Sequence, residues 1–147
     1  EREVLPARVE GYEPSMLDVR CLTGEVAWGR LSVVPQSGSA PGLVRATPLA
    51  LFLRAHADAW HTLRASQDSV DAPTLGPGAR ALLEAMQTRG ASFLSDLSAA
   101  CQLHPAEARE AMGALVACGL SGSDGFSGLR SLLRAGTFTP GSRETRR

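Results

Sequence analysis

The stretch from Gly78 to Arg134 decides the fold, and its first part reads GARALLEAMQTRG (78–90), ASFLSDLSAACQLHP (91–105) and PAEAREAMGALVACG (105–119). Apolar residues recur at helical spacing in each of these segments. Glycine ends the first and the third segment, and Pro105 forces a new start between the second and the third. The pattern predicts three short helices joined by tight turns.

Local signals indicate where these helices begin and which faces they bury. Ser92 is the expected N-cap of the second helix, and Pro105 takes the first position of the third. A Gly/Ser-rich, hairpin-like segment follows Gly119, which is typical of a winged helix, but GFSGLRSLLRAG (125–136) favours a short helix over a long wing strand. The wing should therefore be short. The apolar face of the three helices consists of Ala79, Leu82, Leu83, Met86, Phe93, Leu94, Leu97, Cys101, Ala108, Met112, Leu115 and Val116. The residues that favour the additional short helix are Phe126, Leu129, Leu132 and Leu133.

The first half of the chain predicts a helix and a β-hairpin. GYEPSMLDVRCLTG (11–24) has a proline at the start and a glycine at the end of a helical pattern. EVAWGRLSVV (25–34) and LVRATPLALFLR (43–54) suit two strands that pair back on each other across the loop PQSGSAPG (35–42). AHADAWHTL (55–63) then predicts a short helix.

These elements predict an α+β chain of two modules and a tail. Residues 1–75 form the helix plus β-hairpin module, residues 76–134 the winged helix with its three-helix bundle and short wing, and residues 135–147 a flexible basic tail. A linker of Ser, Asp, Pro and Gly from Arg64 to Pro77 separates the modules, with the boundary near Leu75. Both halves contain a proline-started helix, a glycine and then an extended segment, so the first module could also be the end of another winged helix whose earlier helices lie upstream.

Composition indicates a cytoplasmic protein with no strong charge signal. The 147 residues carry 15 basic and 15 acidic side chains, and every basic one is arginine. No apolar run is long enough to span a bilayer. Cys21, Cys101 and Cys118 are read as buried structural thiols, and the spacing of the three histidines gives no zinc pattern. We therefore expect no metal site.

No catalytic motif is present, so we expect this chain not to be an enzyme by itself. The absence of lysine excludes a phosphate-binding loop of the GxxxxGK[ST] type. The expected outward face of the third helix (Glu107, Arg109, Glu110, Gly113, Ala114 and Ala117) has one cation against two anions, which disfavours reading of a DNA duplex.

Arginines can still contact phosphate, and tryptophans can stack on unpaired bases. For either tryptophan the alternative is core packing, and for the arginines it is a solubilising surface role. Arg45 and Arg134 belong to the wider set of cations. The candidate nucleic-acid-binding residues are Trp28, Arg30, Trp60, Arg80, Arg89, Arg109 and Arg130.

Several segments resemble the large helicase-related proteins (Lhr family) of bacteria, which are superfamily 2 DNA helicases. The similar segments are GYEPSMLD (11–18), CLTGEVAWGRLS (21–32), ATPLALFLR (46–54), GASFLSDL (90–97) and SGSDGFSGLRSLL (121–133). The resemblance extends from about Val9 to Arg134 and covers the region downstream of the two motor domains. Leu120 to Gly122 is more polar than a wing strand of that family.

The resemblance implies an accessory part of an ATP-dependent helicase that moves 3′ to 5′ along single-stranded DNA and unwinds a duplex or an RNA:DNA hybrid during DNA repair. ATP and Mg²⁺ would bind the upstream motor domains, which would be partners of this region within the same chain. In that family an aromatic residue stacks on a base of the tracking strand, and neither Trp28 nor Trp60 is matched to it. Two alternatives remain open: a free-standing winged-helix DNA-binding regulator, and a protein–protein docking module.

Overall fold

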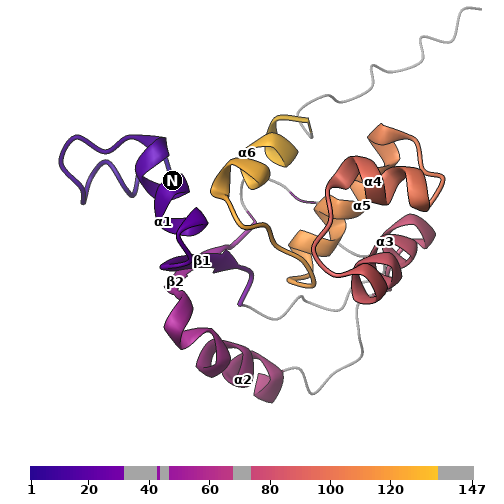
Figure 1. Ribbon diagram of the computed structural model, residues 1–147. Helices are drawn as coiled ribbons and strands as arrows, with labels where there is room; N and C mark the ends of the chain where they lie inside the picture. The colour runs from indigo at the N-terminus through magenta and orange to yellow at the C-terminus, as the bar shows by residue number, and fades with distance from the viewer. Residues whose placement is uncertain (32–42, 44–46, 68–73, 136–147) are drawn as a thin grey trace, which may run out of the picture.

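The computed structural model describes residues 1–31, 43, 47–67 and 74–135 of the chain. The loop 35–42, Arg45, part of the predicted linker (68–73) and the tail from residue 136 lie outside the described residues. The elements follow the order α1 (Pro14–Leu22), β1 (Val26–Gly29), β2 (Ala50–Leu53), a 3-10 helix η1 (Arg54–His56), α2 (Ala57–Gln67), α3 (Pro77–Arg89), α4 (Leu94–Ala100), α5 (Pro105–Ala117) and α6 (Phe126–Ala135) (Figure 1).

The helix and hairpin predicted in the first half are confirmed. Helix α1 has proline in its first turn, and Gly24 follows with a φ of 77°, a conformation that glycine adopts without strain. Strands β1 and β2 pair antiparallel, with Val26 opposite Leu53 and Gly29 opposite Ala50. The short helix predicted after the hairpin is also present, but α2 continues to Gln67, so the first residues of the predicted linker are helical.

The three helices predicted in the second half are present as α3, α4 and α5, but the start of α4 differs from the prediction. Phe93 rather than Ser92 occupies the N-cap position, and the Ser92 hydroxyl donates to the carbonyl of Gly90. Phe93 was expected in the core, yet its side chain is 79% exposed. It precedes the first turn of α4, so it does not share the face on which Leu97 is buried.

Helix α5 has a buried surface wider than the predicted stripe. Ala108, Leu115 and Val116 are buried as expected, but Gly113 and Ala117, which were placed on the outward face, are buried too. A Cβ on Gly113 would lie 3.3 Å from the Cβ of Leu43, so a residue from the first half of the chain covers this side of the helix.

A capping box fixes the start of α5. The Glu107 carboxylate accepts a hydrogen bond from the backbone amide of His104 (2.9 Å), and Nδ1 of His104 accepts one from the amide of Ala106 (3.3 Å). Glu107 was interpreted only as part of a solvated face, whereas it also caps the helix.

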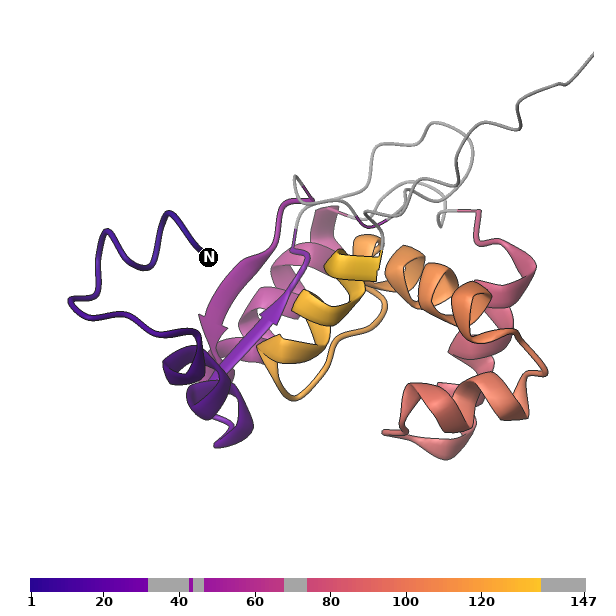
Figure 2. The same cartoon turned by 90° about the horizontal axis from the view of Figure 1, so that it is seen from above.

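The predicted wing is replaced by a loop and a helix. Between α5 and the end of the described residues, no strand follows Gly119; residues 119–125 form a loop that leads directly into α6. The helix predicted from GFSGLRSLLRAG is therefore confirmed, whereas the short wing predicted after Gly119 is not found among the described residues. Figure 2 shows α6 between the hairpin and α5.

Two hydrophobic cores meet at α5. The first core draws on α1, β1, α5 and α6, and its buried members are Leu17, Cys21, Trp28, Val116, Phe126 and Leu129. The second lies among α3, α4 and α5, and its buried members are Ala79, Leu82, Leu97, Ala111 and Leu115. The predicted boundary near Leu75 does not separate these cores, because α6 and part of α5 complete the core of the first half.

Candidate nucleic-acid interface

Trp28 lies in the first core and is 6% exposed. Its ring meets that of Phe126 edge to face, with 5.8 Å between the centroids and 77° between the planes. A ring covered in this way has no open face for a base. Of the two roles considered for Trp28, stacking on a base and core packing, the structure therefore supports core packing.

Arg30 is also inside the molecule, at 9% exposure. Its Nη1 donates a hydrogen bond of 2.9 Å to the carbonyl of Ala117, the last residue of α5. A cation at the C-terminal end of a helix interacts favourably with the helix dipole and with its unpaired carbonyls. Arg30 thus joins the hairpin to α5 and is not a surface cation as predicted.

Arg130 is held by two carboxylates rather than projecting to solvent. Its Nη2 lies 2.7 Å from Glu1 Oε1 and its Nη1 2.7 Å from Asp18 Oδ2. The guanidinium also lies over the ring of Phe126, 5.3 Å from the centroid. This network links α6 to α1 and to the N-terminal segment, and it lowers the pKa of Glu1, mainly through the hydrogen bond from Arg130. The prediction of Arg130 as a nucleic-acid contact conflicts with this structural role.

Tyr12 belongs to the same network and gives it a measurable signature. Its hydroxyl donates a hydrogen bond of 2.6 Å to Glu1 Oε1, and burial together with this contact raises the pKa of Tyr12 to about 12. Tyr12 is the one tyrosine of the chain. Phenolate absorbance in an alkaline titration should therefore report this residue alone, with a midpoint near 12 instead of 10.

The raised pKa also predicts a pH dependence of stability. The folded state holds the Tyr12 proton more tightly, so the stabilisation is complete below pH 10 and is lost as the pH rises from 10 towards 12. Replacing Glu1 by glutamine removes the neighbouring charge and should move the midpoint towards 10. A midpoint near 10 in the unchanged protein would contradict the described contact.

The other four predicted residues are exposed and come from three helices. Trp60 on α2 is 40% exposed, and Arg80, Arg89 and Arg109 lie on α3 and α5. Arg80 donates to the carbonyl of Leu75 at 3.3 Å. None of the four lines the groove or the cleft described next.

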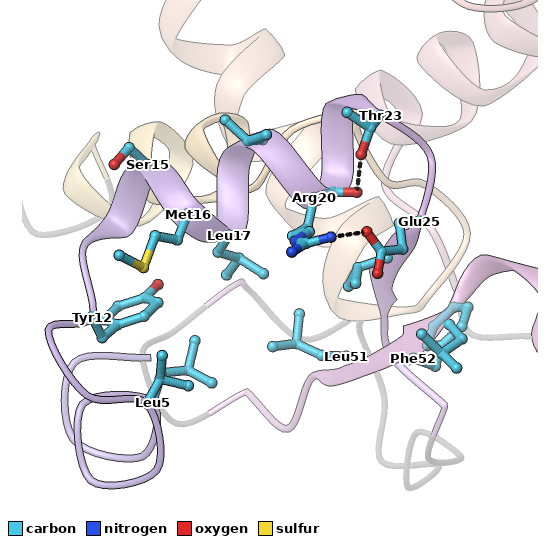
Figure 3. Close-up of a pocket in the computed structure, with 14 residues that line it drawn as sticks. Leu5, Tyr12, Ser15, Met16, Leu17, Arg20, Thr23, Glu25, Leu51 and Phe52 are labelled. Atoms are coloured by element: carbon cyan, nitrogen blue, oxygen red, sulfur yellow. Dashed lines mark hydrogen bonds and ion pairs between the residues drawn. The ribbon is translucent and has the colours of Figure 1, made fainter.

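An apolar groove of about 1060 Å³ lies between α1, the N-terminal segment and β2 (Figure 3). Met16 and Val19 on α1 and Leu51 and Leu53 on β2 are exposed along it. Arg20 and Glu25 form an ion pair at its edge, so their charges neutralise each other. The outward face of α1 therefore suits apolar contacts and does not have the donors needed to read a DNA duplex.

A second hollow, here called the polar cleft, lies between the hairpin, the start of α2 and the loop 119–125. It has a volume of about 390 Å³. Arg54 and His61 line it from one side, and Ser121, Ser123 and Asp124 from the loop on the other. Trp28 and Arg30, two of the predicted site residues, also line it, whereas neither Arg54 nor His61 was predicted as a site residue.

The signal that could have indicated the polar cleft is the Gly/Ser density of GLSGSDG (119–125), which was assigned to a wing. Arg54 ends the hairpin sequence, but nothing local indicates that it faces this loop. The two segments meet because α6 and α5 pack on the first core, which is a long-range property of the fold.

The cysteines fit their predicted structural role. Cys21 and Cys118 are buried and Cys101 is half-buried, and all three are free thiols. Burial raises the pKa of the Cys21 thiol. Within the described ranges, no group of three His, Cys, Asp or Glu side chains is placed to hold a metal ion. The helices of the described part are also too short or too polar to cross a membrane.

Comparison with known proteins gives one match, which falls on the first third of the chain. Residues 1–53 match the family model of the winged-helix domain of the large helicase-related protein. This segment extends to the end of β2 and so contains α1 and the hairpin. No curated protein and no solved structure matches the chain. The match supports the predicted resemblance to the Lhr family for this segment of the chain.

Proposed function

We propose that the chain is a non-catalytic accessory fragment of an ATP-dependent 3′ to 5′ DNA helicase and that it guides single-stranded DNA for the motor. The observation that carries the proposal is the match of residues 1–53 to a helicase-related winged-helix domain. In this proposal the ATP and Mg²⁺ sites belong to motor domains elsewhere in the parent protein, which acts in the cytoplasm on duplexes or RNA:DNA hybrids during repair.

The surface chemistry supports contact with a single strand better than reading of a duplex. Helix α5 is buried on two sides, and the outward face of α1 is apolar. Neither helix presents the row of donors that base readout in a major groove requires. Exposed Trp60 and the exposed arginines of α3 and α5 suit stacking and phosphate contacts instead.

Fluorescence anisotropy with a labelled single strand and a matched duplex tests the proposal. We expect the single strand to bind more tightly, with an affinity that falls about tenfold between about 50 and 200 mM salt, as for a few phosphate contacts. Trp60→Ala should weaken single-strand binding by about 1–3 kcal/mol if this ring stacks on a base. No binding of either DNA would contradict the proposal, and preference for one duplex sequence would favour the free-standing regulator.

The apolar groove favours a second candidate function, that of a protein–protein docking module. A groove with exposed Met16, Val19, Leu51 and Leu53 suits apolar side chains of a protein better than phosphate. DNA binding that is absent in this chain but present in the parent protein would favour this candidate.

A further inference from the structure

The polar cleft concentrates hydrogen-bond donors that have no acceptor. The backbone amides of Ser121, Gly122 and Ser123 donate to no other group of the described residues. Gly122 lies against β1, since a Cβ on it would be 3.7 Å from the carbonyl oxygen of Trp28. The loop therefore lies against the hairpin, and successive amides without an acceptor among the described residues suit an anion.

Arg54 supplies the positive charge on the opposite wall. Its backbone amide donates to the carbonyl of Glu25 at 3.0 Å, which fixes the residue at the end of the hairpin. Its Nη1 lies 3.7 Å from the position that a Cβ on Gly24 would occupy, so the guanidinium lies beside the turn that follows α1. Among the described residues, the Arg54 side chain forms no ion pair and no hydrogen bond.

Three further groups shape the charge of the cleft. Arg30 lines it as well, with its Nη1 bonded to the carbonyl of Ala117. His61 adds an imidazole, and Ala57, the first residue of α2, places the positive end of that helix dipole beside it. Asp124 is the one carboxylate among the lining residues and opposes the cations. Asp124 would repel a bound anion, whereas Arg54 would attract it. The two residues should therefore act on the affinity for the anion in opposite directions.

We infer that the polar cleft binds a phosphodiester group of a single-stranded nucleic acid, with Arg54 and the amides of Ser121 to Ser123 as its ligands. The inference rests on the proposed function and names the site at which the strand is held. A cleft of about 390 Å³ has room for a phosphate with its sugar. An arginine fork and loop amides are both common phosphate ligands.

Titration of the whole chain with a labelled oligo-dT of about twelve nucleotides tests the inference. Arg54→Gln should weaken binding about tenfold and reduce the slope of log K against log salt by about 0.7. Asp124→Asn should strengthen binding about two- to threefold. Arg8→Gln is the matched control, because it removes an exposed arginine that neither lines the cleft nor belongs to the proposed contacts, and it should leave binding unchanged.

The possible failures are distinguishable. If oligo-dT binds and Arg54→Gln behaves like the unchanged protein, the inference is overturned and the proposed function stands. If oligo-dT does not bind, the proposed function fails. Titration with inorganic phosphate, followed by the amide NMR signals of Gly122 and Ser123, then tests whether the cleft binds an anion at all. Shifted signals support an anion site, and unchanged signals overturn it. Displacement of oligo-dT from the cleft by an equal concentration of polyglutamate would overturn the assignment to a phosphodiester.

Discussion

Replacing Trp28 by alanine is expected to lower the free energy of unfolding by about 3–5 kcal/mol, the range for deletion of a large aromatic side chain from a core. The indole is 6% exposed and packs edge to face on Phe126, so the substitution removes buried area and an aromatic contact at once. Chemical denaturation of the purified chain, followed by circular dichroism, measures the loss.

Two substitutions serve as controls for Trp28→Ala. Trp28→Phe retains an aromatic ring, and it loses no hydrogen bond, because the indole Nε1 has no partner among the described groups. It should cost clearly less than Trp28→Ala. Trp60→Ala removes a ring that is 40% exposed and should cost under about 1 kcal/mol. Equal losses at Trp28 and Trp60 would contradict the core position of Trp28.

Leu115→Ala is expected to lower the free energy of unfolding by about 2–5 kcal/mol. Leu115 is fully buried in the second core, while its neighbour Val116 is buried in the first. Because one helix contributes to both cores, we expect the chain to unfold in a single transition and Leu115→Ala to shift that transition as a whole.

Thermal unfolding followed by tryptophan fluorescence and by circular dichroism checks this expectation. In a Trp60→Ala background Trp28 is the one tryptophan and reports on the first core, so its fluorescence should change at the same temperature as the helical signal, with and without Leu115→Ala. Phe93→Ala is the matched control: its ring is 79% exposed, and its loss should change stability by no more than about 0.5 kcal/mol. Two separate transitions would show that the cores fold independently.

The sequence predicts most elements of this chain because their signals are local. Pro14 and Pro105 occupy first helical turns, and Gly24, Gly90 and Gly119 follow helices with positive φ. Such residues act through backbone conformation and need no distant partner. The hairpin pairing could likewise be predicted from two apolar runs on either side of a loop.

The errors concern contacts between segments far apart in the chain. Gly113 and Ala117 were placed outside because α5 was treated as a helix with one buried face, whereas Leu43 covers Gly113. Arg30 was predicted as a surface cation because nothing near it in sequence shows that the carbonyl of Ala117 is its acceptor. Periodicity gives the inner face of an element but not how many neighbours the element has.

The candidate site was the least predictable part. Residue type suggested Trp28, Arg30 and Arg130 as DNA contacts, and all three serve the packing of the first core or its junctions. Arg54 and the Gly/Ser loop carry the cleft, but they are brought together only by the packing of α6. A lone arginine in a sequence gives no indication of which loop it will face.

The position of α6 also has a consequence for synthesis on the ribosome. Leu17, Cys21 and Trp28 are translated roughly a hundred residues before Phe126 and Leu129, which cover them. Until α6 has left the exit tunnel, the nascent chain carries an uncovered apolar surface, which is a target for chaperones and for aggregation. The first half is thus translated before α6 but completes its core only after α6 is made.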